Sequence, residues 1–514
     1  MTRENQANQP NGQSQAAGER KLIEDRLAKT AEIRSRGLDP YPPRFNRTHT
    51  SVEAVALFQS LEEGGTESDH SDSHSVRVAG RVMARRGQGK ASFIDVRDGH
   101  GSIQIFARQN TMGDESYAIL DLLDIGDIIG IEGVVIRTRR GEISVEAKTI
   151  TLLTKAIRPL PDKWHGLQDQ EVRFRQRYLD LISNEKAMQN ALLRTKIVRS
   201  MRDFMHARGF IEVETPILVP VAAGAQATPF ATHHNQLNRD LYLRIATELY
   251  LKKLIVGGIE RVFEIGRLFR NEGLDHDHNP EFTTIESYQA YADYNDVMCM
   301  VEEMIAQIAQ DTTGSMILPA ISEKRPEINL TPPWPRLDLR SEIMKRTGID
   351  FVETRDIESL SKAMQECGIH VEPGSDWGRL LDKVISSEVE PNLIQPHFLI
   401  DYPVEMSPLA KRKPGSSDIV ERFEAFVMGT ELANAFTELN DPVDQRERFE
   451  QQERLREEFD NDEADRLDED FLIAIEHGMP PTGGLGLGID RLTMLVAGEE
   501  SIREILLFPA MRNI

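Results

Sequence analysis

The sequence predicts an α+β protein with more than one domain, and three observations support this fold class. The chain has 514 residues, too many for a single hydrophobic core, so two or three domains are expected. Residues 76–154 consist of short apolar runs with period-two alternation, which is typical of β-strands. The chain after residue 185 combines amphipathic helices with further strands and hairpins.

Composition and charge limit the classes of function. Hydrophobic residues make up 39% and charged residues 28%, as in ordinary soluble globular proteins. A net charge of −23 argues against a nucleic-acid partner, but the acidic residues concentrate in segments such as 447–470, so such a partner is not excluded. Cys299 and Cys367 lack metal-ligand spacing, which fits a reducing compartment. Without a signal-like or membrane-spanning apolar run, we expect a cytoplasmic protein and no membrane partner.

The N-terminal segments precede the strand-rich region. Residues 1–18 are polar and rich in Gln and Asn, so we expect a disordered tail. Helical periodicity predicts one helix over 19–37 and another over 51–61, followed by a polar loop over 62–75. Beyond the strands, the proline-containing and charged segment 155–185 is predicted to join two domains.

The strand-rich segment 76–154 predicts a small β-barrel, because about five short strands fit into fewer than a hundred residues. Strand alternation makes Phe93 and Ile94 face opposite ways. A barrel face carrying Arg81, Phe93 and Gln104 could stack against unpaired bases and bind them through hydrogen bonds. An outward phenylalanine on a half-buried sheet is equally common for structural reasons, so this signal is weak by itself.

The next segment begins with a helix over 185–208 whose apolar stripe is typical of a core or a dimer interface. A strand over 210–216 follows, and then the small-residue loop 221–230, which would let the backbone approach a ligand closely. Glu248 stands near the start of another helix, where a carboxylate often compensates the helix dipole and indicates little alone.

The stretch 269–288 predicts two strands joined by a long polar loop over 273–280. Because residues two apart on a strand share a face, Arg270 and Glu272 point together. The same holds for four residues after the loop: Phe282, Thr284, Glu286 and Tyr288. Such a surface suits a nucleotide beside a cationic substrate. The alternative is an amphipathic hairpin with a solvated face.

Residues 315–395 are expected to form an insertion of mixed helix and loop, and a hairpin follows that turns near Gly429. Glu424 and Glu431 flank this turn and could form a hard-cation site completed by substrate phosphates. Glu431 is off parity with Asn434, so both can line one site only if the strand contains a bulge.

A glycine-rich string, GGLGLGIDRL, spans residues 483–492. Gly486 and Gly488 would permit close packing beneath a ligand, and Arg491 is expected in the first turn of a helix. Without a Walker lysine, the glycines alone are a weak phosphate-binding signal.

Taken together, these segments resemble class II aminoacyl-tRNA synthetases, and the bacterial lysyl-tRNA synthetase family in particular. The resemblance is carried by GFIEVETP at 209–216, by FRNEG and HNPEFT within 269–283, and by GLGIDR at 486–491. Further matching strings are YLRIATELYLKKL, ESYQAYADY, ELANAFTELND and LLFPAMR. The resemblance covers nearly all of 76–309 and 396–512.

The resemblance implies an OB-fold anticodon-binding domain within 19–154 and a catalytic domain over 186–514, built on an antiparallel sheet flanked by helices. It also implies a homodimer formed partly through the first motif. The activity would be ATP-dependent activation of L-lysine, with magnesium, followed by transfer to the 3′ end of tRNA(Lys).

Site residues are carried over by position from the family motifs. Arg270 would hold the ATP α-phosphate, and Phe282 and Arg491 would enclose the adenine, so that Arg270 and Arg491 are the expected catalytic residues. Glu272, His278 and Asn279 would also contact ATP. Glu424 and Glu431 would bind magnesium. The lysine pocket would comprise Gly224, Glu248, Glu286, Tyr288, Asn434, Phe436 and Glu438. Arg81, Phe93 and Gln104 would contact the anticodon.

Three positions depart from the family pattern, namely Asp277, Thr228 and Ala223, and they fall in loops rather than among the residues named above. Three other functions remain as alternatives. An aspartate or asparagine enzyme of the same subclass would want basic residues in its pocket, and a lysine ligase acting on elongation factor P would lack the barrel. A non-catalytic OB-type nucleic-acid binder would leave Arg270, Glu424, Glu431 and Arg491 without a role.

Overall fold

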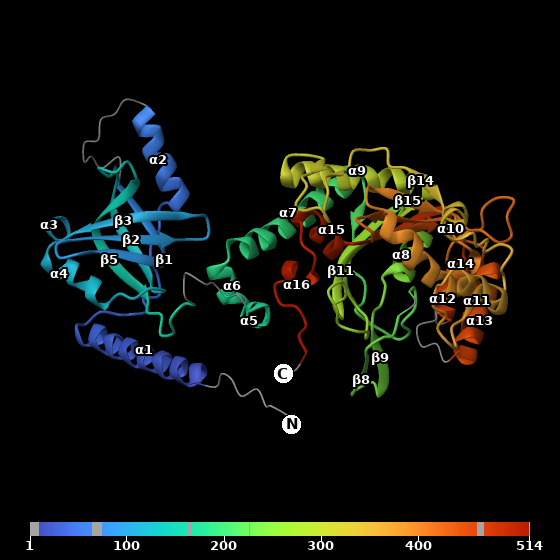
Figure 1. The fold of residues 1–514 in the computed structure, drawn as a ribbon, viewed down its shortest axis with the longest axis horizontal. Helices are drawn as coiled ribbons and strands as arrows, with labels where there is room; N and C mark the ends of the chain where they lie inside the picture. Colours follow the sequence, from blue (N-terminus) through green and yellow to red (C-terminus); the bar gives the residue numbers. More distant parts are fainter. Residues whose placement is uncertain are drawn as a thin grey trace, which may run out of the picture. The chain divides into compact units, whose positions relative to one another are not determined.

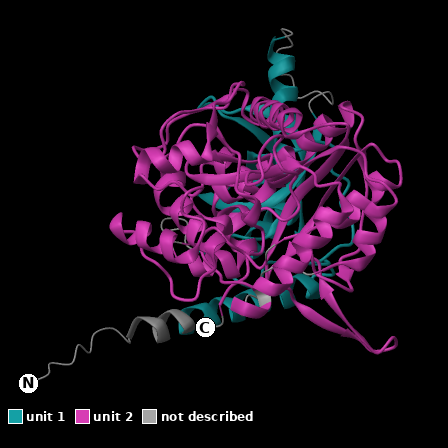
Figure 2. Ribbon diagram, turned by 90° about the vertical axis from the view of Figure 1, so that its right-hand side faces the viewer, with its two compact units in different colours: residues 1–166 teal, residues 167–514 magenta. Residues whose placement is uncertain are grey.

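The computed structural model divides into two compact units, residues 1–166 and 167–514, coloured separately in Figure 2. The expected tail and the polar loop over 62–75 fall partly outside the described residues, and the first helix, α1 (Pro10–Ser35), begins earlier than residue 19. Within the described residues, no helix is long and apolar enough to cross a membrane. The structure describes residues 10–63, 75–161, 167, 169–225, 227–459 and 467–512.

The first unit is built on a closed β-barrel (Figure 1). Its strand order is β1-β2-β3-β5-β4. All its pairings are antiparallel except that of β3 with β5. Alternating side chains such as Ile94 and Val96 point inward and fill the barrel, which confirms the predicted small β-barrel. The elements after α1 are α2 (Ser51–Glu63), β1 (Ser75–Gln88), β2 (Ala91–Arg97), β3 (Ser102–Arg108), α3 (Gln109–Met112), α4 (Asp114–Tyr117), β4 (Ile128–Arg137) and β5 (Ile143–Thr154).

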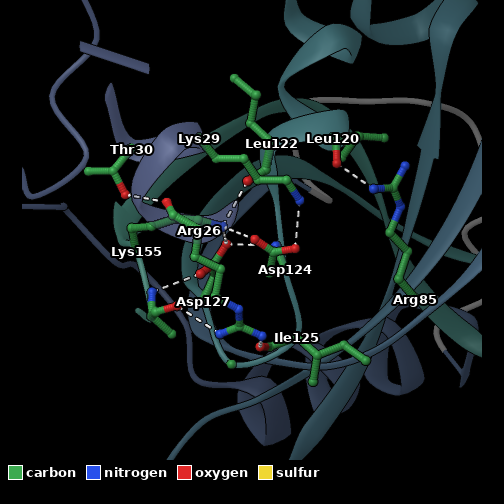
Figure 3. Close-up of polar contacts among 12 residues, drawn as sticks. Arg26, Lys29, Thr30, Arg85, Leu120, Leu122, Asp124, Ile125, Asp127 and Lys155 are labelled. Carbon is green, nitrogen blue, oxygen red and sulfur yellow. Dashed lines mark hydrogen bonds and ion pairs between the residues drawn. The ribbon is translucent and has the colours of Figure 1, made fainter. Parts of the chain in front are cut away.

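A buried ionic cluster fastens α1 to the barrel (Figure 3). The Lys155 side chain is fully buried, and its Nζ donates to Asp127 Oδ2 at 2.7 Å and to Asp124 Oδ2 at 2.5 Å. From α1, Lys29 Nζ donates to Asp124 Oδ1 at 2.6 Å, and Arg26 donates to three backbone carbonyl groups of the same unit. Burying these charges is tolerable because each carboxylate has a cation beside it.

The second unit is organised by an eight-stranded sheet with the order β14-β15-β16-β17-β18-β11-β10-β6. Its pairings are antiparallel except β14 with β15 and β10 with β6, which confirms the predicted α+β class with an antiparallel-rich sheet. The strands are β6 (Ile211–Glu212), β10 (Arg261–Phe269), β11 (Glu281–Ala290), β14 (Arg336–Asp338), β15 (His397–Ile400), β16 (Arg422–Val427), β17 (Thr430–Thr437) and β18 (Thr482–Gly488).

Three helices cover one face of this sheet: α7 (Glu185–Ala207), α9 (Tyr294–Thr313) and α15 (Ile489–Ala497). Ile285 and Leu485 of the sheet are buried in this core. Residues of opposite parity, such as Tyr288, turn to the other face, where they pack near α8 (Glu248–Val256) and α14 (Glu469–Glu476). Period-two alternation therefore separates an apolar core from a second face that is free to carry polar side chains.

The apolar stripe of α7 divides into two parts. Ile197, Met201 and Met205 are fully buried in the core. Met188 and Leu192 lie nearer the start of the helix and remain 36% and 52% exposed. The stripe is therefore core along its second half and an exposed apolar surface along its first half.

The segment expected as a strand over 210–216 pairs only through the two residues of β6, so that prediction is too long. Beyond β6 the chain still follows β10, because Val213 N donates to Phe263 O at 2.9 Å and Thr215 N donates to Glu264 Oε2 at 3.0 Å. The side chain of Glu264 thus replaces the backbone partner of a continued strand.

Most of residues 315–395, from Leu339 to Leu393, contributes to a separate apolar cluster that packs on β15 and β16, whereas Leu318, Ile328 and Trp334 belong to the core of the large sheet. Leu360 and Leu381 lie at the centre of the separate cluster together with Phe426 of the sheet. The helices of this segment are α10 (Leu339–Thr347), α11 (Ile357–Glu366) and α12 (Trp377–Val384), and its short strands are β12 (Ile317–Leu318) and β13 (Ile328–Asn329).

A small three-stranded sheet and several helices complete the unit. Helices α5 and α6 occupy part of the expected linker over 155–185. These elements are α5 (Gln170–Arg175), α6 (Arg177–Ser183), β7 (Leu218–Val219), β8 (Ala231–His234), β9 (Arg239–Leu243), α13 (Pro442–Phe459) and α16 (Ile502–Ile505).

Removing the buried ammonium should destabilise the barrel. We expect Lys155→Met to cost roughly 3–5 kcal/mol, because two carboxylates would lose their buried partner. Native-state hydrogen exchange of the amides in β4 and β5 measures this loss locally. Lys29→Met is the matched control and should cost less than about 1 kcal/mol, because its ion pair with Asp124 is partly exposed. Equal losses in the two variants would contradict the role of burial.

Candidate functional site

A cavity of about 460 Å³ opens on the face of the large sheet opposite α7, α9 and α15. It is lined by strands β10, β11, β16, β17 and β18 and by the loops that follow β10 and precede α8. Every residue expected to bind ATP, metal or lysine lines this one cavity: Gly224, Glu248, Arg270, Glu272, His278, Asn279, Phe282, Glu286, Tyr288, Glu424, Glu431, Asn434, Phe436, Glu438 and Arg491. The sequence predictions were made on separate segments, and the fold brings them together.

Glycines on β18 make room for the cavity floor. Gly484 lies opposite Tyr288 on one side and Phe436 on the other, and Gly486 lies opposite Glu286 and Asn434. A Cβ atom on Gly484 would come within 1.8 Å of a Glu438 carboxylate oxygen. The glycine at this position is therefore required by the close approach of the side chains above it.

Carboxylates gather at one end of the cavity. Glu286 on β11 accepts a hydrogen bond from the backbone N–H of Thr247 at 3.1 Å, just before α8. Burial, together with the neighbouring charge of Glu248, raises the pKa of Glu286 to about 7. Burial also raises the pKa of Glu438 well above its usual value, and the pKa of Tyr288 is raised by burial and by the surrounding carboxylates. This end of the cavity is thus prepared for a cation.

One buried cation, Lys252, stands among these carboxylates, and sequence reasoning missed it. It lies four residues after Glu248 on α8, and its Nζ is 2.5 Å from Glu248 Oε1 and forms an ion pair with Glu438. Its side chain has no exposed surface. Helical spacing of Glu and Lys at i and i+4 could have indicated the first contact, but only the fold places Glu438 beside it.

An arginine and an aromatic ring occupy the other end of the cavity. The guanidinium of Arg270 lies over the ring of Phe282, 5.1 Å from its centre, and burial lowers the Arg270 pKa. Arg491 lies in the first turn of α15, as expected, and donates to the backbone oxygen and to Oε2 of Glu431 at 2.9 and 3.0 Å. A guanidinium beside an aromatic plate can hold a phosphate next to a stacked base.

The polar loop between β10 and β11 supplies the remaining residues expected to contact ATP. His278 Nδ1 lies 2.9 Å from Asp275 Oδ2. Asn279 is buried, and both polar atoms of its side chain have partners: the amide nitrogen donates to Glu281 O at 2.6 Å, and the oxygen accepts from Ala510 N at 3.0 Å. Glu272 lines the cavity with an exposed side chain. The loop therefore borders the arginine end of the cavity.

The two carboxylates expected at a metal site approach through a β-bulge. Strands β16 and β17 pair Glu424 with Asn434 but Phe426 with Glu431, so the register shifts by one residue between them. This shift brings Glu431 to the cavity, as the parity argument required. Burial and the charge of Glu431 raise the pKa of Glu424 to about 7, against the opposing effect of Arg422.

Glu424 is held in place by three side chains. Its Oε1 accepts from Arg422 at 2.6 Å and from Asn434 at 3.2 Å, and its Oε2 accepts from the hydroxyl of Tyr402 at 2.8 Å. Among the described residues, no group of three or more His, Cys, Asp or Glu side chains could hold a metal ion by itself. A cation at Glu424 and Glu431 would therefore need further oxygen ligands from a substrate, as Mg²⁺ commonly takes from phosphates.

The barrel carries the three residues expected to contact an anticodon on its outer face. Strand register places Gln104 opposite Asp95, and it places Arg81 opposite Arg97 at one end of the same face. Arg81 donates to Gly126 O at 2.7 Å, and burial lowers its pKa. Arg81, Gln104 and Phe93 thus lie along the outer face of β2 and its neighbouring strands, next to Arg97, next to Asp95, and two residues further along β2.

Phe93 and Gln104 are already ordered by neighbours. The Phe93 ring is stacked on Phe106 with centroids 4.6 Å apart and planes 9° from parallel. Gln104 donates to Glu142 at 2.9 Å and accepts from Ser144 at 3.0 Å. Phe106 was not among the residues expected to contact the anticodon, although period-two parity of β3 places it on the same face as Gln104.

Comparisons with known proteins agree with this arrangement. The family model described as tRNA synthetases class II (D, K and N) matches residues 169–512, and the OB-fold nucleic acid binding domain model matches residues 76–153. A lysine--tRNA ligase of Dehalococcoides mccartyi is 51% identical over 96% of this chain and 97% of its own length. The corresponding ligase of Carboxydothermus hydrogenoformans is 50% identical over 96% of this chain and 98% of its own.

A lysine--tRNA ligase of Staphylococcus epidermidis is 49% identical over 95% of this chain and 98% of its own length. The matches span both compact units, and the family model covers the cavity described above. The resemblance inferred from the sequence motifs is therefore confirmed. This chain belongs to the class II tRNA synthetases of the D, K and N group, and its relatives at about half identity are lysine--tRNA ligases.

Proposed function

We propose that the protein is a lysine--tRNA ligase, which activates L-lysine with ATP to lysyl-adenylate and transfers the lysyl group to the 3′ end of tRNA(Lys). The observation that carries the proposal is the polarity of the cavity. Buried carboxylates gather at one end, around Glu286 and Glu438, and Arg270 and Phe282 lie at the other. This arrangement suits a cationic amino acid beside a nucleotide.

The acidic end of the cavity would bind the amino acid. Ammonium groups of lysine would be held by Glu248, Glu286 and Glu438, with the Tyr288 hydroxyl nearby, since a buried ammonium needs hydrogen-bond acceptors to offset its desolvation. A carboxylate substrate such as aspartate would be repelled by the same groups. Gly224, Asn434 and Phe436 would complete the walls, although Asn434 also donates to Glu424.

The other end would bind ATP. Arg270 would neutralise the α-phosphate, and adenine would stack on Phe282, with Arg491 as the second cation. Glu272, His278 and Asn279 lie along the loop that borders this end. Adenylation joins a carboxylate oxygen of lysine to the α-phosphorus and expels pyrophosphate, so charge develops on phosphate oxygens. Positioned cations therefore supply most of the catalysis, and no side-chain nucleophile is needed.

A divalent cation fits the Glu424 and Glu431 pair, and we propose magnesium. The raised pKa of buried Glu424 beside another carboxylate is relieved by a bound cation, and these oxygen donors suit a hard metal ion. When bound, the ion would neutralise charge on the ATP phosphates. Arg422 and Tyr402 would keep Glu424 oriented toward that position.

The outer face of the barrel would bind the tRNA anticodon. Phe93 offers a stacking surface, and Arg81 and Gln104 offer polar groups to unpaired bases.

We further propose a cytoplasmic homodimer that uses the exposed apolar start of α7 around Met188 and Leu192. Sedimentation velocity can test this assembly. The two cysteines are free, in agreement with a reducing compartment.

The direct test is ATP–pyrophosphate exchange with each of the twenty amino acids, with magnesium present and tRNA absent. We expect exchange with lysine alone, because only lysine among the twenty has a side-chain ammonium to place among the buried carboxylates. Exchange with aspartate at an equal rate would refute the proposal.

Arg270→Ala should reduce lysine-dependent exchange strongly, because the α-phosphate would lose its buried cation.

Glu286→Gln should raise the lysine KM by about 10- to 150-fold, which corresponds to roughly 1.5–3 kcal/mol for a charge-assisted hydrogen bond. Since the pKa of Glu286 is raised to about 7, wild-type lysine KM should fall as the pH rises through 7 and Glu286 ionises. The variant should lose this pH dependence. Glu303→Gln, which changes an exposed carboxylate on α9, is the control and should leave lysine KM unchanged.

The same raised pKa has a consequence for stability. Folding favours the protonated Glu286 carboxyl, so this contribution is fully present below about pH 4.5 and is lost as the pH rises through about 7. The Gln variant should therefore gain stability relative to wild type between these pH values. Thermal unfolding of both proteins at pH 5 and pH 8 measures this gain. A stability difference between variant and wild type that is the same at both pH values would show that Glu286 does not titrate with a raised pKa.

Phe93→Ala should weaken tRNA binding by roughly 1–3 kcal/mol, the range for loss of one base stack. Pyrophosphate exchange without tRNA should stay at the wild-type rate, because the barrel face is not part of the cavity in the second unit. Comparison of the aminoacylation KM for tRNA with the exchange rate measures both. A parallel loss in the two assays would mean that Phe93 is structural.

A further inference from the structure

The amino-acid end of the cavity contains an internal ammonium that is not part of its surface. Lys252 Nζ is fully buried on α8, whereas its partners Glu248 and Glu438 both line the cavity. The lysine therefore stands behind the carboxylates and leaves the space in front of them open to a ligand. A buried lysine is costly to desolvate, so its position calls for an explanation.

Lys252 contacts four side chains of the cavity wall from behind. Its Nζ is 2.5 Å from Glu248 Oε1 and forms an ion pair with Glu438 Oε2. It also lies 5.9 Å from the ring centre of Tyr288 and 5.5 Å from that of Phe436. These distances are within the range of cation–π attraction, so one ammonium supports both the acidic and the aromatic walls.

The two carboxylate oxygens of Glu438 differ in their ion pairing. Among the described residues, both are buried and neither has a hydrogen-bond partner, but Oε2 forms the ion pair with Lys252 whereas Oε1 forms none. Oε1 lies over Gly484, where a Cβ atom would come within 1.8 Å of it. A buried carboxylate oxygen without a donor at the wall of a cavity is a ready acceptor for a ligand ammonium.

The charges of this end can be counted. Glu248, Glu286 and Glu438 would carry three negative charges when ionised, and Lys252 carries one positive charge, which leaves two. Free lysine has two ammonium groups, on its α-carbon and at the end of its side chain. Without Lys252, burial and the mutual repulsion of these carboxylates would favour protonation of Glu438, whose pKa the lysine lowers.

We propose, on the basis of the function proposed above, that Lys252 is a positioning residue for the amino-acid pocket. It favours the ionised form of Glu438 against the effect of burial, and it holds the carboxylate so that one oxygen can accept a hydrogen bond from a substrate ammonium. Lys252 does not touch the substrate and acts through Glu438. Tyr288, Glu248 and Glu286 are the other titratable groups that face Glu438.

The test compares four proteins in lysine-dependent ATP–pyrophosphate exchange: wild type, Lys252→Met, Glu438→Gln and the double variant. Lys252→Met should raise the lysine KM by about 10- to 150-fold, as expected for loss of a charge-assisted hydrogen bond, and should leave the ATP KM unchanged. In the Glu438→Gln background, Lys252→Met should add little, because the residue through which it acts has already lost its charge.

Lys253→Met is the matched control, since it removes the next lysine along α8, which pairs with the exposed Asp470 at 2.6 Å. It should leave both KM values unchanged. Lys252→Met alone could unfold, because it leaves buried carboxylates without their cation. The double variant removes one of these negative charges together with the lysine. Comparison of its lysine KM with that of Glu438→Gln then decides whether Lys252 acts through Glu438.

Three results would overturn the inference alone while the wild type exchanges with lysine. The first is an unchanged lysine KM in Lys252→Met, and the second is that the effects of Lys252→Met and Glu438→Gln simply add. The third is a parallel rise in the lysine and ATP KM values, which would indicate a merely structural role. Absence of lysine-dependent exchange in the wild type would instead overturn the proposed function, and the inference with it.

Discussion

The cavity depends on the cost of keeping carboxylates away from water. Glu286 and Glu438 are almost fully buried, and the fold supplies one ammonium, Lys252, among them. Such groups are stable in the ionised form only beside a cation, and the raised pKa of each records the shortage of positive charge. Selection of a substrate with a side-chain ammonium follows from this imbalance, because that ammonium supplies the positive charge that this end of the cavity lacks.

The large sheet stabilises the fold enough to tolerate this excess of buried negative charge. One face buries an extensive apolar core against α7, α9 and α15, so the opposite face is free to carry charged side chains. Gly484 removes the side chain that would otherwise fill the floor, and the bulge between β16 and β17 turns Glu431 toward the cavity. The glycine and the bulge each interrupt regular packing in order to position a polar group. The apolar core on the other face offsets the stability that these interruptions cost.

Sequence patterns predicted the elements whose side chains follow a simple period. Parity within 269–288 placed Glu286 and Tyr288 on one face, and alternation predicted the barrel. Features that depend on pairing between distant segments were beyond such patterns. The bulge before Glu431 could be stated only as a condition for both carboxylates to line one site. The contact of Lys252 with Glu438 joins α8 to the residue that follows β17. The strand at β6 is short because the side chain of Glu264 accepts the next hydrogen bond in place of a backbone carbonyl.

The most direct test of the account is calorimetric binding of lysine and of norleucine, whose side chain ends in a methyl group. At pH 7, lysine should bind about 10- to 150-fold more tightly, as for one charge-assisted hydrogen bond between buried partners. Its binding should also release protons, because an ammonium favours ionisation of Glu286 at a pKa of about 7. Equal affinities, with no proton release, would contradict the claim that buried carboxylates in excess over the one buried ammonium select the substrate.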